Sequence, residues 1–118
     1  MISHASLHLL FIEPGGRPSS VPVIDALTRR MVGAWRARTR REPGWRGLHM
    51  CTGERCYAKS DNYDSFVVTV DGKRLMTNSL CIHYLAQHRE EVMAEDLRKV
   101  ARLLADEWEP TTEEMNGY

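Results

Sequence analysis

Apolar residues recur at the spacing of an α-helix in two long stretches of the chain. The first stretch predicts a helix over about residues 21–38, with Pro22 tolerated in the first turn because an N–H group there would have no partner within the helix. The second stretch predicts a helix over about residues 94–108, which Pro110 would end. The two apolar stripes consist of Ile24, Leu27, Met31 and Trp35, and of Met93, Leu97, Val100, Ala101, Leu104 and Trp108. Each helix should therefore bury one face.

The middle of the chain has the residue pattern of β-structure. Apolar and β-branched residues at 66–70 and 73–76 flank Asp71-Gly72, and Asp-Gly favours the positive φ angles of a two-residue hairpin turn. The pattern therefore predicts a hairpin over residues 66–76. Shorter strands are expected at residues 48–51 and 56–59 around a turn at Gly53, and a further strand is expected over residues 2–12.

A third helix is expected over residues 79–89, because Thr77, Asn78 and Ser79 offer capping side chains ahead of an apolar run. These elements define the α+β class, with a small antiparallel sheet packed against about three helices. The length of 118 residues fits a single domain, which we place at residues 1–110. Residues 111–118 are expected to form an acidic, flexible tail.

The cysteines and histidines of this chain are concentrated in one segment. All three cysteines and three of the five histidines lie between residues 49 and 88. Cys51 and Cys56 are separated by four residues that include a glycine, a spacing found in structural zinc loops. His49 should share a strand face with Cys51, and Cys81 should lie in the first turn of the next helix. The spacing predicts a structural zinc site formed by Cys51, Cys56, Cys81 and His49, with His83 as the alternative fourth ligand.

Helical geometry separates the remaining histidines from Cys81. His83 would lie about 200° around the helix from Cys81, and His88 would lie about 10.5 Å further along its axis. We therefore expect His88 to lie outside the site. An alternative is that the thiols and imidazoles bind no metal, since free cysteine packs as a small buried hydrophobic residue.

A reactive thiol is a third interpretation of the same segment. If Asn78 caps the helix, Cys81 lies near unpaired N–H groups and the positive end of the helix dipole, which lower the pKa of a thiol. His83 or His49 would then be the candidate base. On this interpretation the catalytic candidates are Cys81 and His83.

Two further groups of polar residues are candidate sites. Polar turn residues beside the hairpin could line a small pocket, and this group consists of Asp61, Asn62, Asp64 and Asn78. An arginine-rich segment could hold a phosphate or an acidic partner, and its candidates are Arg36, Arg38, Arg40 and Arg41.

Charge is unevenly distributed although the formal net charge is zero. Residues 29–46 carry seven arginines against one glutamate, a local net charge of +6, and residues 89–118 carry nine acids against four bases, a local net charge of −5. These opposite charges could bind separate partners, or could attract each other within one fold or across a dimer.

The composition indicates a small cytoplasmic protein. An odd number of cysteines argues against a secreted disulfide framework, and residues 1–12 lack a basic signal-peptide region. No apolar run approaches the roughly 20 residues that span a bilayer, so no membrane association is expected.

We expect a binding protein with one structural zinc ion, whose partner is another protein or a second copy of the chain. The alternative is a small enzyme that uses Cys81 or a metal bound by the same segment. A third option is nucleic-acid binding through residues 29–46, although the chain lacks a recognisable motif for it.

Overall fold

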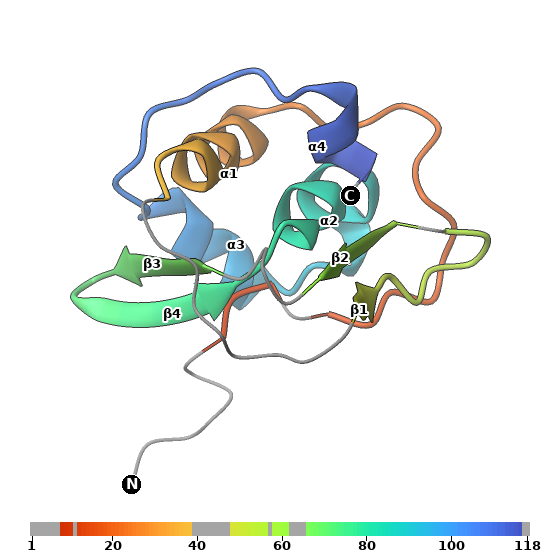
Figure 1. Cartoon of the computed structure of the whole chain (residues 1–118), viewed down its shortest axis with the longest axis horizontal. Helices are drawn as coiled ribbons and strands as arrows, with labels where there is room; N and C mark the ends of the chain where they lie inside the picture. The colour runs from red at the N-terminus through yellow and green to blue at the C-terminus, as the bar shows by residue number, and fades with distance from the viewer. Residues whose placement is uncertain (1–7, 11, 39–47, 57, 62–65, 117–118) are drawn as a thin grey trace, which may run out of the picture.

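The computed structural model describes residues 8–10, 12–38, 48–56, 58–61 and 66–116, with the backbone alone at residues 48–49 and 59–61 (Figure 1). These residues form an α+β fold, which confirms the predicted class. In chain order the elements are α1 (Ala26–Arg36), β1 (Leu48–Met50), β2 (Lys59–Asp61), β3 (Phe66–Val70), β4 (Lys73–Thr77), α2 (Leu80–Gln87), the 3-10 helix η3 (Arg89–Glu91), α3 (Ala94–Ala101) and α4 (Thr112–Asn116).

The described strands form two antiparallel pairs. In the hairpin β3–β4, Phe66 pairs with Thr77 and Val70 with Lys73. Its turn residues Asp71 and Gly72 have φ angles of 52° and 79°, as the Asp-Gly pattern predicts. Strand β1 pairs with β2, which begins at residue 59 and not at residue 56 as expected.

The N-terminal strand predicted over residues 2–12 falls largely outside the described residues. Within them, His8 forms an isolated parallel bridge with Met76. The backbone N–H group of Leu9 donates to the oxygen of Met76 at 3.0 Å. Leu9 and Leu10 are buried, so this short segment contributes to the core beside β4.

Helix α1 begins at Ala26, five residues later than predicted. The reason is its cap, because Oδ1 of Asp25 accepts hydrogen bonds from the N–H groups of Leu27 and Thr28, each at 3.1 Å. The residues before the cap pair with the end of α2, where the N–H groups of Ser19 and Val23 donate to backbone oxygens at 2.8 and 2.7 Å. Pro22 therefore precedes the helix.

Helix α2 lies near the centre of the fold in Figure 1 and packs against α1 and α4. Its first seven residues are all buried. Oδ1 of Asn78 accepts from the N–H group of Leu80 at 2.9 Å, so Asn78 has the predicted capping role. The largest fully buried side chains of the core include Tyr84, Phe66, Leu9, Leu10, Met31, Leu80, Ile82 and Leu85.

Helix α3 ends at Ala101, so the predicted extension to residue 108 is wrong. After Ala101 the chain turns back and crosses the outer side of α1, as the blue segment of Figure 1 shows. There the N–H group of Trp108 donates to the backbone oxygen of Arg29 at 3.1 Å. The crossing is close because a Cβ atom at Gly33 would overlap the backbone oxygen of Asp106. Leu104 is 99% exposed and Trp108 52% exposed, so neither completes the expected buried stripe.

We expected a flexible tail after residue 110, but residues 112–116 form helix α4, which packs against α2. Thr111 and Glu114 cap it reciprocally. The N–H group of Glu114 donates to Oγ1 of Thr111 at 3.1 Å, and Oε1 of Glu114 accepts from the N–H group of Thr111 at 2.8 Å. Glu114 is buried and paired with Arg36, which anchors the acidic segment to α1.

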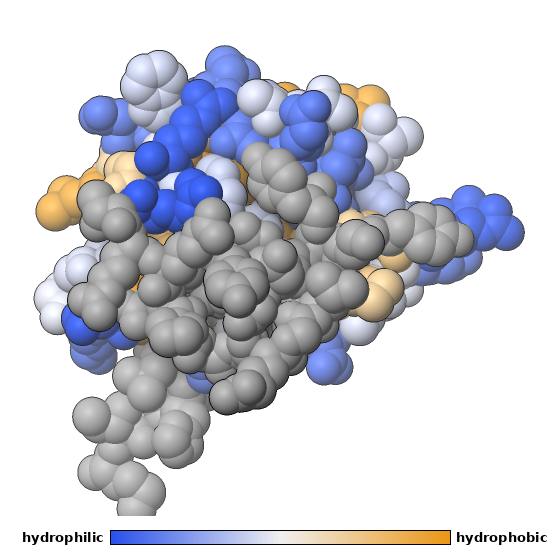
Figure 2. Space-filling model, in the orientation of Figure 1, coloured by the Kyte–Doolittle hydropathy of each residue, from blue (hydrophilic) through white to orange (hydrophobic). Residues whose placement is uncertain are grey.

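None of the described helices is long and apolar enough to cross a membrane. Figure 2 shows mainly hydrophilic side chains on the described part of the face in view, with only small apolar patches.

Candidate metal centre

Two cysteines and two histidines converge on one point of the fold. One ligating atom from each of Cys51, Cys56, His83 and His88 lies within 4.8 Å of the other three. The cysteines flank the turn that follows β1, whereas His83 lies on α2 and His88 at its C-terminal end. A Cys2His2 cluster is therefore present at metal-binding distance.

The turn that carries the cysteines is held by backbone hydrogen bonds. The N–H group of Cys51 donates to the oxygen of Ala58 at 2.9 Å, and that of Cys56 donates to the oxygen of Gly53 at 3.1 Å. The N–H group of Gly53 points to Sγ of Cys51 at 3.4 Å. Arg55 has a φ of 55°, which turns the chain so that both sulfurs face α2.

Gly53 is required at this turn because His88 lies directly against it. A Cβ atom at position 53 would lie 2.6 Å from Cε1 of His88 and 2.8 Å from the backbone oxygen of Gly16. That same oxygen accepts from the N–H group of Glu54 at 2.9 Å. The cysteine turn, the loop at residues 15–16 and His88 are therefore packed together at this position.

The first thiol–imidazole pair consists of Cys51 and His88, both buried. Sγ of Cys51 lies 3.4 Å from Nε2 of His88. Nδ1 of His88 lies 3.0 Å from Oε2 of Glu91, and the other oxygen of that carboxylate accepts the N–H groups of Gly15 and Gly16 at 2.9 Å each. Partial burial opposes ionisation of Glu91, but these hydrogen bonds outweigh it and lower the pKa of Glu91. A carboxylate accepts the proton on Nδ1, so in the neutral form of the ring Nε2 carries the lone pair that faces Cys51.

The second pair consists of Cys56 and His83. Sγ of Cys56 lies 3.1 Å from Nε2 of His83, while Nδ1 of His83 donates to the backbone oxygen of Met115 in α4 at 2.8 Å. A carbonyl oxygen can only accept, so the proton is on Nδ1. Burial lowers the pKa of His83 to about 4, although the Met115 carbonyl opposes this shift. His83 is therefore neutral at pH 7, with its Nε2 lone pair directed at Cys56.

These four residues fit a tetrahedral metal ion. Bond lengths of about 2.3 Å to sulfur and 2.0–2.1 Å to nitrogen place ligand atoms about 3.3–3.8 Å apart. The two sulfur–nitrogen pairs, at 3.4 and 3.1 Å, are already close to this range, and the other separations, none above 4.8 Å, need to contract by about 1.5 Å at most. Both imidazoles also have the outer hydrogen bond on Nδ1 that typically orients a metal-bound histidine.

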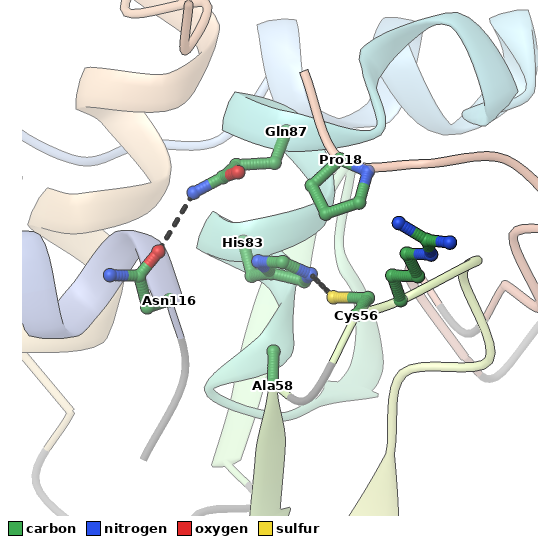
Figure 3. A pocket seen from close by; sticks show the side chains of 7 residues that line it. Pro18, Cys56, Ala58, His83, Gln87 and Asn116 are labelled. Atoms are coloured by element: carbon green, nitrogen blue, oxygen red, sulfur yellow. Dashed lines mark hydrogen bonds between the residues drawn. The ribbon is translucent and has the colours of Figure 1, made fainter. Parts of the chain in front are cut away.

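A cavity of about 290 Å³ borders the second pair (Figure 3). Figure 3 shows the His83 ring between Cys56 and the side chain of Asn116, and Nε2 of Gln87 donates to Oδ1 of Asn116 at 2.8 Å at its edge. Cys56 is half-buried, unlike Cys51. The cavity is lined by Pro18, Arg55, Cys56, Ala58, His83, Gln87 and Asn116.

The structure corrects the expected ligand set at Cys81 and His88. Cys81 is fully buried in α2 and does not belong to the cluster. His83 is two residues further along the helix and so points to the other side, where the cysteine turn lies. His88, which we expected outside the site, joins it because it leaves the helical conformation, with φ −127° and ψ 34°, and its ring lies 5.0 Å from that of His83.

The reactive-thiol interpretation of Cys81 is not supported. Burial raises the pKa of Cys81 to about 12, the opposite of the expected direction. Its candidate base His83 is hydrogen-bonded to Cys56. The side chain of His49 is not among those that the structure describes, so its role as a ligand stays a prediction. The backbone of His49 pairs with Ser60 in β1–β2.

The polar pocket and the arginine site are only partly described. Asn62, Asp64 and the side chain of Asp61 lie outside the described part of the chain, whereas Asn78 is buried and its side chain caps α2. Arg40 and Arg41 also lie outside it. The guanidinium of Arg38 stacks on the ring of Trp35, 3.3 Å from its centroid.

The acidic partner of Arg36 is found within the chain. Arg36 donates to both carboxylate oxygens of Glu114, at 2.7 and 3.1 Å, and to the backbone oxygen of Glu109 at 2.9 Å. Arg29 similarly pairs with Glu107 at 3.2 Å. Part of the basic segment therefore binds the acidic segment intramolecularly.

No protein family, curated protein or solved structure matches the chain. The functional interpretation therefore rests on the geometry of the Cys2His2 cluster.

Proposed function

We propose that this chain is a small binding protein whose fold is stabilised by one zinc ion bound to Cys51, Cys56, His83 and His88. The observation that carries the proposal is the orientation of both imidazoles, each with Nε2 facing a cysteine sulfur and Nδ1 held by an acceptor. Two thiolates and two neutral imidazoles in a tetrahedral arrangement form the donor set that zinc prefers.

A structural role follows from the number and burial of the ligands. Four protein ligands fill a tetrahedral zinc site, whereas a catalytic zinc keeps one position open for water or substrate. Three of the four residues are buried. The ion would join the cysteine turn to α2, and through Glu91 and Met115 it would also fix the loop at residues 15–16 and α4.

The proposed partner is another protein or a second copy of the chain, in the reducing environment of the cytoplasm, where thiols remain available for a metal. Two surface features support a protein partner. Leu104 and Trp108 are exposed on the segment that crosses α1. Arg29 and Arg36 are engaged by acidic residues of the same chain, which weakens the case for a nucleic acid. Light scattering across a wide concentration range tests self-association directly.

A small metal enzyme is the alternative function, and the cavity beside Cys56 and His83 is the observation that favours it. Cobalt substitution separates the two functions. A four-coordinate cobalt spectrum with two thiolate ligands supports the structural site, whereas a fifth, exchangeable ligand supports the enzyme.

The zinc content of the purified chain tests the proposal, with matched cysteine variants. We expect about one zinc ion per chain in the natural sequence and in Cys81→Ser, and a strong loss in Cys51→Ser. Cys51 and Cys81 are both buried, so both variants lose a buried thiol. Only Cys51→Ser also loses a proposed zinc ligand. A natural chain that stays free of zinc after zinc-supplemented expression would refute the proposal.

A further inference from the structure

The two cysteines of the cluster differ in their access to solvent. Of the three cysteines, all of which are described, Cys56 alone is not buried. It lines the cavity of about 290 Å³, which is much larger than a molecule of hydrogen peroxide. A small oxidant can therefore reach Cys56 from the cavity, whereas Cys51 is buried behind it and Cys81 is buried in α2.

A second thiol lies within reach of Cys56. Sγ of Cys51 belongs to the same group of ligating atoms, all within 4.8 Å of one another. Only four residues separate the two cysteines, and their turn is already closed by the hydrogen bonds from Cys51 to Ala58 and from Cys56 to Gly53. A disulfide requires the two sulfurs to approach to about 2.05 Å, and a rotation of the half-exposed Cys56 side chain shortens this gap.

We propose that Cys56 is a site of oxidation by hydrogen peroxide, that Cys51 resolves it to a disulfide, and that this reaction releases the zinc ion. The inference rests on the proposed function, because it assigns a regulation to the same metal centre. It makes the Cys2His2 centre a peroxide-responsive element in addition to a structural one.

The reaction proceeds in two balanced steps. The Cys56 thiolate attacks one oxygen of hydrogen peroxide and the O–O bond breaks. The sulfur is oxidised to a sulfenic acid, and the departing hydroxide takes a proton to form water. The Cys51 thiolate then attacks the sulfenic sulfur, forming the S–S bond and expelling a second hydroxide, which also takes a proton to form water. Two thiolates, one peroxide and two protons thus give one disulfide and two waters.

Loss of both thiolates leaves the zinc ion with only two imidazole ligands. Two protein ligands do not hold structural zinc, which needs four. His83 and His88 then lose the partners of their Nε2 atoms. Because His83 contacts α4 and His88 contacts Glu91, oxidation is expected to loosen the contacts around both histidines.

The test uses the zinc-loaded full chain, whose zinc content is measured before hydrogen peroxide is added. A chromogenic chelator follows zinc release, intact mass follows the loss of two hydrogen atoms, and peptide mapping locates the bond. We expect one zinc ion released for each Cys51–Cys56 disulfide formed, sulfenic acid trapping at Cys56 first, and rebinding of zinc after reduction. Cys81→Ser should behave like the natural sequence.

Three results would overturn the inference. These are retention of zinc under peroxide, release of zinc without a disulfide, and a disulfide that involves Cys81. Failure of the proposed function is distinguishable, because a chain without zinc at the start refutes that proposal before any peroxide is added. The decisive measurements use the natural chain, so they do not depend on a variant that fails to fold.

Discussion

The two thiol–imidazole pairs of the metal centre share one arrangement but have different surroundings. Cys51 and His88 are buried, and the outer nitrogen of His88 meets a carboxylate that is itself held by two backbone N–H groups. Cys56 and His83 border a cavity, and the outer nitrogen of His83 meets a neutral carbonyl of the C-terminal helix. One half of the centre is enclosed by the core, whereas the other is accessible at Cys56.

Because of this difference, the two pairs are expected to contribute differently to the metal site. A hydrogen bond to a charged group is roughly twice as strong as one between neutral groups, so Glu91 should orient His88 more firmly than Met115 orients His83. The Cys51–His88 pair is therefore expected to dominate zinc affinity. The Cys56–His83 pair is expected to determine how easily small molecules reach the site and how firmly α4 is held against the fold.

The largest effect is expected from Gly53→Ala, which acts on the enclosed half. The new Cβ atom would lie 2.6 Å from the His88 ring and 2.8 Å from the backbone of Gly16, so either His88 or the turn must move. We expect zinc affinity to fall by about a hundredfold or more, since a displaced ligand costs more than a lost outer hydrogen bond. Competition with a chelator of known affinity measures the change.

Gly15→Ala is the matched control for this substitution. Position 15 lies in the loop beside the site, but a Cβ atom there meets nothing within 4 Å, and the N–H group that donates to Glu91 is retained. Its zinc affinity should stay within about twofold of the natural chain. Equal affinities for both alanine variants would contradict the close packing of Gly53 against His88.

The next effect is expected from Glu91→Gln. An amide can still accept the N–H groups of Gly15 and Gly16, but its NH2 group cannot accept the Nδ1 proton of His88. Loss of an outer-sphere partner typically lowers metal affinity by about 10–100-fold. Glu90→Gln changes net charge equally at an exposed neighbouring position and should leave zinc affinity unchanged. Equal losses in both variants would show that general charge, and not the bond to His88, is responsible.

The fold was largely predictable from local patterns in the sequence. The hairpin β3–β4 follows from Asp71-Gly72 between alternating residues, and α2 follows from an apolar run after Asn78. Helix boundaries were less predictable. Leu104 and Trp108 fit the helical stripe predicted to residue 108. However, the segment crosses α1 at Gly33, and the backbone of Trp108 pairs there with Arg29, a long-range contact that helical periodicity does not encode.

Half of the metal site was predictable, together with one alternative ligand. Cys51 and Cys56 were identified by spacing, and His83 as the alternative ligand. The missed signal was the four-residue spacing of His83 and His88, which matches that of the cysteines and is typical of Cys2His2 zinc sites. The departure of His88 from helical geometry was not predictable from periodicity. The pattern Thr-x-x-Glu at residues 111–114 likewise signals the capping box of α4.

A smaller effect is expected from Glu114→Ala, which acts on the accessible half. It removes two hydrogen bonds from Arg36 and the side-chain cap of α4. The free energy of unfolding should therefore fall by about 1–2 kcal/mol. The loss is moderate because Arg36 is partly exposed to water. Zinc affinity should fall by about tenfold at most, because His83 loses orientation and not a ligand. Glu113→Ala, at an exposed neighbouring position, should change neither quantity. A larger affinity loss here than in Glu91→Gln would reverse the proposed ranking of the two halves.

The smallest effect is expected from Asp25→Asn, which acts on the ion pair between Asp25 and Arg89, the residue next to His88. Arg89, next to His88, donates to both oxygens of Asp25 at 2.7 Å, while Asp25 caps α1. Asparagine keeps the cap and loses the charge, so the unfolding free energy should fall by less than about 1 kcal/mol for this partly exposed pair.

The pH dependence of that difference makes the prediction specific to Asp25. The hydrogen bonds from Arg89 lower the pKa of Asp25 in the folded chain to about 2, below its ordinary value of 3.8. Asp25 therefore contributes stability that is complete above pH 3.8 and is lost as the pH falls towards 2. Chemical unfolding of the zinc-loaded chains should give a constant difference between the natural and Asn variants from about pH 8 to pH 5. A difference that shrinks within this range would show that another titrating group, and not Asp25, anchors His88 to α1.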